Sequence, residues 1–202
     1  MQLIYAPASP FARKVRVLAI ETGLMDRLEP VETTVMPVSL NEGVNAANPL
    51  GKIPALMMDD GQALYDSRVI CEYLDSLHNG PRLFPAEALR RWPALRLAAL
   101  ADGLMDAAVL ARYEKAMRPA ERQWDEWLDG QLGKVRRALR ALEDSAAQLQ
   151  GPLDIAQIGV GCALGYLDFR FAELYWRNEF PGLTAFQERF SARDSMRQTE
   201  PA

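Results

Sequence analysis

The sequence contains a single histidine, His78, and only two cysteines, Cys71 and Cys162. A Ser-His-Asp triad or an HExxH metal site needs histidine in contexts that one isolated residue does not provide. Two cysteines outside a CxxC arrangement exclude a disulfide framework and favour a reducing compartment. We therefore expect neither histidine-dependent hydrolysis nor a metal site.

Several other signatures are missing. No glycine-rich loop of the GxGxxG or GxxxxGK[ST] type occurs, so nucleotide binding through such a loop is not indicated. The formal charge of −4, from 23 basic and 27 acidic residues, argues against a nucleic-acid partner. The N-terminus lacks the order of a signal peptide, and the longest apolar run, 158–167, is shorter than the ~20 residues that span a membrane. These features predict a soluble, cytoplasmic protein without a membrane partner.

The first third of the chain alternates between strand and helix signals. The apolar run 3–5 and the alternating, β-branched stretch 28–35 predict two strands. Between them, Pro10 suits the first turn of a helix that Gly23 ends. Two strands joined by a helix favour a parallel pair with a right-handed crossover.

A hairpin and a second helix complete this region. The Asp-Gly step at 60–61 predicts a tight turn between strands at 55–58 and 63–65. Ser67 is a candidate N-cap for the helix that follows. Together these elements predict an α/β domain over residues 1–77.

The composition changes at a linker, 78–85, that is rich in glycine and proline. Beyond it, hydrophobic residues recur at helical spacing and no strand signal is evident, which predicts an all-helical domain over 86–202. Asp154 and Gln157 have the spacing of a capping box. The segment 155–171 behind them is apolar almost all round, so we expect a helix buried at the centre of this domain.

Four local sequences stand out along the chain: SPFARK at 9–14, NPLGKIPAL at 48–56, DSRVI at 66–70 and DIAQI at 154–158. They resemble motifs of the glutathione S-transferase family. The matches cover the whole chain in the family's order, and the Ser-Pro-Phe sequence resembles a small bacterial serine-type branch. The resemblance implies a thioredoxin-like, glutathione-binding N-terminal domain followed by an all-α C-terminal domain.

The chain departs from the family pattern in two places. Asp66 stands where glutamate is commoner. At the start of the buried helix, this chain has Asp154 at the cap and Gln157 three positions later, where the family usually has serine or threonine at the cap and aspartate three positions later. Both replacements keep the hydrogen-bonding chemistry of the motif, so we expect the fold to be unchanged.

The resemblance gives Ser9 the catalytic role, in which its hydroxyl donates a hydrogen bond to the sulfur of glutathione. Such a bond, together with the positive end of the first helix, favours the thiolate over the thiol. Two alternatives remain open. Ser9 serves only as the N-cap of its helix, or Tyr5 in the first strand supplies the hydroxyl.

The other glutathione contacts also come from the resemblance. The backbone of Ile53 would pair with the cysteinyl part of glutathione, held in place by a cis peptide bond before Pro54. Lys52 would reach the glycyl carboxylate, while Asp66 and Ser67 would bind the γ-glutamyl end. The alternatives are an ordinary trans proline, a solvated Lys52, and simple capping by Ser67 with Asp66 in solvent.

Residues of the second domain are implied in two further contacts. Met105 and Arg112 would touch a second substrate. Asp102 would contact glutathione in a partner subunit. For each of these residues, the alternative is a position on the helix surface or in the core without a role in binding. The family implies a homodimer that uses glutathione as co-substrate.

The predicted function is therefore glutathione transfer to a small hydrophobic electrophile, with a role in detoxification. Reduction or dehalogenation at the same site is an alternative reaction. A non-catalytic binding or regulatory protein is an alternative of a different class. No motif in the sequence encodes the identity of the second substrate.

Overall fold

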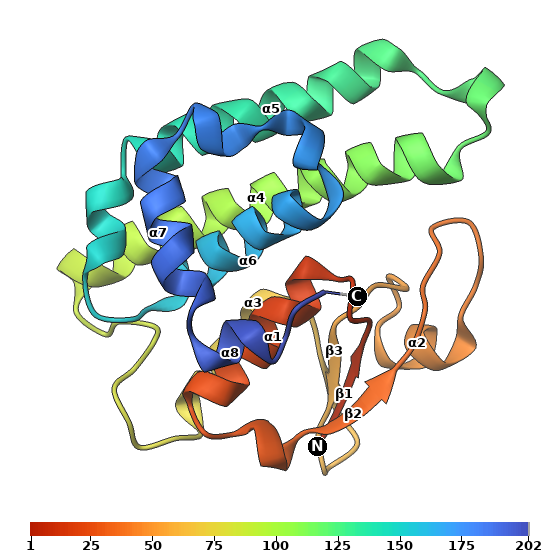
Figure 1. Ribbon diagram of the computed structural model, residues 1–202. Coiled ribbons are helices and arrows are strands. Elements are labelled where there is room, and N and C mark those ends of the chain that lie inside the picture. The colour runs from red at the N-terminus through yellow and green to blue at the C-terminus, as the bar shows by residue number, and fades with distance from the viewer. Residues whose placement is uncertain (202) are drawn as a thin grey trace. The chain divides into compact units, whose positions relative to one another are not determined.

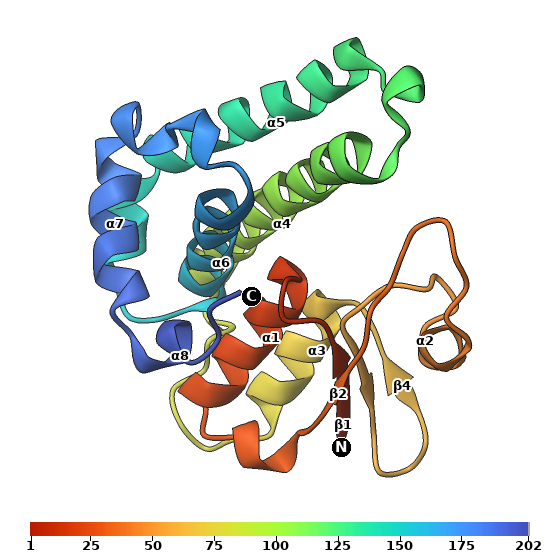
Figure 2. The same ribbon diagram turned by 45° about the vertical axis from the view of Figure 1, so that its right-hand side comes forward.

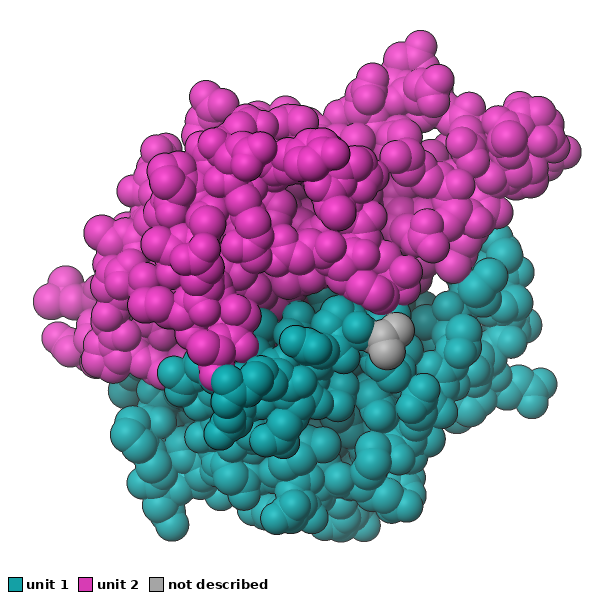
Figure 3. Space-filling view, viewed as in Figure 1, with its two compact units in different colours: residues 1–86, 193–202 teal, residues 87–192 magenta. Residues whose placement is uncertain are grey.

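The computed structural model describes residues 1–201, and the chain separates into two compact units. Unit 1 comprises Met1–Ala86 and Arg193–Ala202, and unit 2 comprises Glu87–Ala192 (Figure 3). The boundary between the two units, at residues 86 and 87, therefore lies just after the predicted linker, 78–85. Its last residues group with unit 1, whereas the sequence-based division placed them in the helical domain 86–202.

Unit 1 is built on a four-stranded sheet in the order β2-β1-β3-β4 (Figure 1). The strands are β1 (Gln2–Tyr5), β2 (Glu29–Glu32), β3 (Ala55–Met57) and β4 (Ala63–Leu64). β1 and β2 are parallel, while β3 is antiparallel to both β1 and β4. The predicted parallel pair and hairpin are confirmed, and Gly61 at the hairpin turn has a positive φ of 83°, which glycine adopts without strain.

Helices cover both faces of this sheet. They are α1 (Pro10–Glu21), α2 (Glu42–Ala47) and α3 (Ser67–Ser76), while α8 (Asp194–Arg197) packs on α1. Figure 2 shows α1 and α3 together on one face and α2 on the other. Ile4 and Ala55 pack against Val44 and Ala47 of α2. Leu3 lies on the opposite face, because side chains alternate along a strand, and it is also fully buried.

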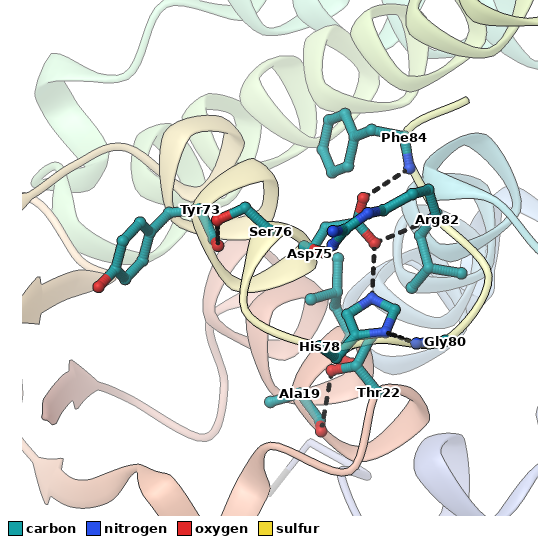
Figure 4. Close-up of polar contacts among 11 residues, drawn as sticks. Ala19, Thr22, Tyr73, Asp75, Ser76, His78, Gly80, Arg82 and Phe84 are labelled. Carbon is teal, nitrogen blue, oxygen red and sulfur yellow. Dashed lines mark hydrogen bonds and ion pairs between the residues drawn. The ribbon is translucent and has the colours of Figure 1, made fainter. Parts of the chain in front are cut away.

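The linker is fixed to the end of α3 by the buried side chain of Asp75 (Figure 4). Its carboxylate accepts hydrogen bonds from the backbone N–H groups of Leu83, at 2.8 Å, and Phe84, at 3.1 Å. The Nε2 atom of His78 lies 3.0 Å from the same carboxylate, and Arg82 donates to the Asp75 carbonyl oxygen. The predicted linker is therefore a segment with its own specific anchor.

Unit 2 contains four long helices, and no strand forms within its described residues. The helices are α4 (Ala88–Met117), α5 (Asp125–Glu143), α6 (Ile155–Arg170) and α7 (Pro181–Ser191). Short 3-10 turns complete the chain: η1 (Met25–Arg27), η2 (Ala120–Arg122), η3 (Ala146–Gln150), η4 (Ala172–Leu174) and η5 (Trp176–Asn178). The predicted order of an α/β region followed by a helical region is confirmed. Within the described residues, none of the helices combines the length and apolar character needed to span a membrane.

The central helix of unit 2 is α6, as its all-round apolar sequence predicted. A Cβ built on Gly159 would lie 3.4 Å from the Cβ of Ala101 on α4, so glycine allows these helices to approach closely. Asp154 caps α6 by accepting from the N–H groups of Ala156, at 2.9 Å, and Gln157, at 3.2 Å.

The capping box predicted at this helix start is only half formed. The side chain of Gln157 donates to the carbonyl oxygens of Leu149, at 3.3 Å, and Gly151, at 3.0 Å, instead of returning to the cap. Gln157 therefore ties the end of η3 to α6, and it supplies the donor that the buried carbonyl oxygen of Leu149 needs.

Candidate active site

The fold brings three of the predicted segments to one edge of the sheet. β3 is antiparallel to both of its neighbours, so the end of β1, the start of β3 and the end of β4 lie at the same edge. Ser9 follows β1, the Ile53–Pro54 bond precedes β3, and Asp66–Ser67 follows β4. The N-termini of α1 and α3 therefore start at this edge, and their partial positive charges favour an anion there.

Ser9 is the N-cap of α1. Its Oγ accepts a hydrogen bond from the Ala12 N–H at 3.2 Å, and its carbonyl oxygen accepts from the Arg13 N–H at 2.9 Å. Pro10 occupies the first helical position, as predicted. Because the hydroxyl oxygen is the acceptor in the cap, its O–H proton is free to be donated elsewhere. Capping and hydrogen-bond donation to a sulfur are therefore compatible roles.

The rival hydroxyl, Tyr5, lies half-buried at the end of β1. The guanidinium carbon of Arg16 is 5.0 Å from the centre of the Tyr5 ring, which is a cation–π contact. Arg16 also donates to the carbonyl oxygen of Gln198 at 3.4 Å. Tyr5 thus packs beneath a side chain that joins α1 to the C-terminal segment.

The C-terminal segment is tied to α1 by two further buried or half-buried contacts. Glu21 accepts two hydrogen bonds from Arg193, each at 2.7 Å, and a third from Ser195 at 2.5 Å. Arg13 is 6% exposed and donates to the carbonyl oxygen of Met196 at 3.0 Å. The hydrogen bond between Arg13 and Met196 was not predicted from the sequence. The burial of a charged residue on α1, which indicates a distant partner, is visible only in the structure.

The predicted cis peptide bond before Pro54 is confirmed. The preceding loop is held by Asn48, which is 2% exposed. Its side chain donates to the Lys52 carbonyl oxygen at 2.9 Å and accepts from the Leu50 N–H at 3.1 Å. Among the described residues, the backbone N–H and C=O of Ile53 have no hydrogen-bond partner, so they are available for strand-like pairing. The side chain of Lys52 is exposed.

Asp66, not Ser67, is the N-cap of α3. Its carboxylate accepts from the Arg68 N–H at 2.9 Å and lies 3.6 Å from the Arg68 guanidinium group. Ser67 is the first helical residue and is 2% exposed. The predicted cap at Ser67 was wrong by one position, because aspartate is as good a capping residue as serine and stands one residue earlier. The Tyr65–Asp66 peptide bond is cis.

The three predicted residues of unit 2 lie on α4. Met105 and Asp102 are 0% and 2% exposed, and Arg112 is half-buried. Because Met105 is completely buried, its position agrees with the alternative that it packs in the helical core and does not touch a substrate. Cys71 and Cys162 are buried and are not joined in a disulfide. No group of three or more histidine, cysteine or acidic side chains suited to a metal ion occurs among residues 1–201.

Comparison with known proteins gives consistent matches along the chain. Family models of the glutathione S-transferase N-terminal and C-terminal domains match residues 3–82 and 125–189. YibF, an uncharacterised GST-like protein of Escherichia coli, is 33% identical over 204 residues, which cover 100% of this chain and 98% of YibF.

Two solved structures are similar over the full length. A glutathione transferase family member from Pseudomonas fluorescens Pf-5, crystallised with bound glutathione, is 52% identical with a TM-score of 0.98, and the match covers 100% of this chain and 98% of that one. A structure of a family member from the same organism with bound S-(propanoic acid)-glutathione is 51% identical with a TM-score of 0.93 over 100% of both chains.

A small mixed sheet flanked by helices, followed by a helical region with a buried central helix, defines the glutathione S-transferase fold. Because the similarity in sequence extends over the full length of the chain, it supports assignment to a family and not only to a fold. The chain belongs to the glutathione S-transferase family, which confirms the resemblance of its four motifs.

Proposed function

We propose that this protein binds glutathione at the sheet edge of unit 1 and activates its thiolate for transfer to a small electrophile. The observation that carries the proposal is the convergence of Ser9, the unpaired Ile53 backbone and Ser67 at that edge. The glutathione bound by the Pseudomonas fluorescens relative supports the choice of ligand.

Each part of the tripeptide has a matching group at the edge. The N–H and C=O of Ile53 pair with the cysteinyl residue like an added strand. Lys52, exposed on the same loop, neutralises the glycyl carboxylate. The N–H groups at the start of α3, beginning with Ser67, hold the γ-glutamyl carboxylate, and Asp66 offers its charge to the α-ammonium group.

The chemistry needs a thiolate and no histidine. Ser9 donates its hydroxyl proton in a hydrogen bond to the sulfur, and the N-terminus of α1 adds positive potential. Both effects favour the thiolate, and each unit by which the thiol pKa falls corresponds to roughly 1.4 kcal/mol. The sulfur forms a bond to the electrophilic carbon with its own electron pair, and the leaving group departs with the pair of the broken bond.

The second substrate meets residues of unit 2 in this proposal. Arg112 on α4 contacts it, and the fully buried Met105 shapes the packing behind that surface. The S-(propanoic acid)-glutathione bound by a relative supports a site that accepts a substituent on the sulfur. The wider proposal is a cytoplasmic homodimer that acts in detoxification.

The decisive experiment combines calorimetry with a titration of thiolate absorbance. Wild type should bind glutathione and hold its thiol at a lowered pKa. Ser9→Ala and Ser9→Gly both remove the hydroxyl donor, but glycine is the better N-cap, so the pair separates loss of donation from loss of capping. Both variants should raise the thiol pKa equally, whereas Ser191→Ala, an exposed serine on α7, should leave it unchanged.

The possible results separate the parts of the proposal. Absence of glutathione binding in wild type would overturn it completely. An unchanged thiolate titration in both Ser9 variants would remove the catalytic role of Ser9. Glutathione binding without turnover of any electrophile would favour the non-catalytic alternative.

A further inference from the structure

Arg13 places a buried positive charge one helical turn after Ser9 at the start of α1. Its backbone N–H donates to the Ser9 carbonyl oxygen at 2.9 Å, and the residue is only 6% exposed. Residues four positions apart lie on the same face of a helix, and the Cα–Cβ bonds of a helix tilt toward its N-terminus. The charge of Arg13 therefore lies on the side of α1 that carries the Ser9 cap.

The hydrogen-bond partners of the Arg13 side chain among the described residues are neutral. Its Nη2 atom donates to the Met196 carbonyl oxygen at 3.0 Å, and its Nε atom donates to Thr199 Oγ1 at 3.4 Å. Thr199 is fully buried and uses its own proton in a bond to the Ser195 carbonyl oxygen at 2.7 Å. The C-terminal segment, 193–202, packs beside α1 (Figures 1 and 2) and thus solvates the guanidinium group without neutralising it.

No acidic side chain among residues 1–201 pairs with Arg13. The acidic groups of α1 and α8 have cations of their own. Glu21 accepts hydrogen bonds from Arg193. Asp194 forms an ion pair with Arg197. The other acidic side chains of the C-terminal segment and of the elements packed against α1 are exposed or, in one case, bonded to the linker; they are Asp26, Asp66, Glu72, Asp75 and Glu200.

A buried charge without a counter-ion favours an anion in its surroundings. Burial weakens the solvation of the guanidinium group, and its field is screened less than that of an exposed charge. Arginine keeps its charge at every pH at which proteins are folded. Lys14 and Arg16, the other cations of α1, have the same sign and do not offset it. The anion that the proposed function places beside Ser9 is the thiolate of glutathione.

We propose that the buried charge of Arg13 stabilises the glutathione thiolate beside Ser9 without touching it. This inference rests on the proposed function and adds one residue to it. Ser9 supplies a hydrogen bond, the N-terminus of α1 supplies a partial charge, and Arg13 supplies a full charge. The C-terminal segment preserves that charge, because it offers only neutral oxygen atoms to the guanidinium group. The alternative is a structural role, in which Arg13 only ties this segment to α1.

The first test removes the charge and then restores it. Arg13→Met keeps an unbranched apolar side chain without the guanidinium group, whereas Arg13→Lys keeps a positive charge. Titration of thiolate absorbance should show that Arg13→Met raises the pKa of the bound glutathione thiol by about one, while Arg13→Lys stays near wild type. Arg27→Met, at an exposed arginine in η1, is the matched control and should leave the thiol pKa unchanged.

A second readout uses ligands whose charge at the sulfur does not change with pH. Glutathione sulfonate carries a permanent negative charge at that position, and S-methylglutathione is neutral there. Calorimetry should show that Arg13→Met binds the sulfonate roughly tenfold more weakly than wild type does, with no change for S-methylglutathione. Arg13→Lys should recover the affinity for the sulfonate. Loss of a structural tie would instead weaken the binding of both ligands.

Thr199 allows the charge to be neutralised while Arg13 stays in place. Thr199→Asp puts a carboxylate beside the guanidinium group and should raise the thiol pKa, whereas Thr199→Asn, of nearly the same shape, should not. Unchanged thiol pKa values in both Arg13→Met and Thr199→Asp would overturn the inference while leaving glutathione binding intact. Equal effects of Arg13→Met and Arg13→Lys would also overturn it, because they would assign Arg13 the structural role. Failure of wild type to bind glutathione would overturn the proposed function and this inference with it.

Discussion

The side-chain amide of Asn48 donates a hydrogen bond to the carbonyl oxygen of Lys52, 2.9 Å away, across the loop that leads to Ile53. The same side chain accepts from the Leu50 N–H, so one buried residue sets the path of the loop. The residues proposed to pair with glutathione thus depend on a side chain that does not contact it.

Asn48→Ala should therefore weaken glutathione binding by roughly tenfold, equivalent to ~1.4 kcal/mol, because the loop loses both bonds. Calorimetry measures this change. Asn178→Ala, at an exposed asparagine in unit 2, is the control and should bind as wild type does. Normal binding by Asn48→Ala would show that the loop keeps its conformation without this anchor.

The contact between Glu21 and Arg193 predicts a pH dependence of stability. Hydrogen bonds from Arg193, against the opposing effect of burial, hold the pKa of Glu21 below its ordinary value of 4.5. Since the folded-state pKa is lowered, the stabilisation is fully present above 4.5 and is lost as the pH falls through the folded-state value.

Glu21→Gln should accordingly lower the free energy of unfolding near neutral pH by about 1 kcal/mol, a value kept small by solvent screening of this half-exposed pair. The difference from wild type should shrink as the solution is made more acidic than pH 4.5. Urea unfolding at several pH values measures it. A difference that stays constant with pH would contradict the role of the Glu21 charge.

The carboxylate of Asp75 lies within hydrogen-bond distance of His78 Nε2 and of the N–H groups of Leu83 and Phe84. Its removal should therefore lower the free energy of unfolding strongly. Asp75→Ala leaves the buried N–H groups of Leu83 and Phe84 without partners, and we expect a loss of about 3 kcal/mol in the free energy of unfolding. Asp75→Asn keeps one acceptor oxygen and should lose less. Asp26→Ala, at an exposed aspartate, serves as the control in the same urea titration; an equal effect of Asp26→Ala and Asp75→Ala would refute the anchor.

Local chemistry explains which parts of this molecule were predictable. The hairpin follows from the Asp-Gly step at 60–61, the start of α1 from Pro10, and the burial of α6 from its apolar sequence. Each of these signals involves residues a few positions apart. The position of the α3 cap was missed by one residue because Asp66 and Ser67 are both good capping residues.

Contacts between distant residues left no such signal. Arg13 donates to a carbonyl oxygen 183 positions away, so neither its burial nor the return of the C-terminus to α1 could be inferred from spacing. The candidate site was partly predictable, since the motifs predicted the start of α1 after Ser9 and the cis peptide bond before Pro54. The anchoring role of Asn48 was missed because a side chain that bonds to backbone atoms is recognised only once the loop path is known.

Gly161 and Gly130 provide a final matched test, because both are helical glycines in very different surroundings. A Cβ added to Gly161 on α6 would overlap the ring of Phe190, whereas one added to the exposed Gly130 on α5 meets nothing within 4 Å. Gly130→Ala should stabilise the protein by about 0.5–1 kcal/mol, since alanine loses less backbone entropy in a helix. Gly161→Ala should destabilise it by about 1–3 kcal/mol, because a tightly packed ring must move. Thermal unfolding of the two variants should therefore shift in opposite directions, and shifts of the same sign would contradict the close packing of α6 against α7.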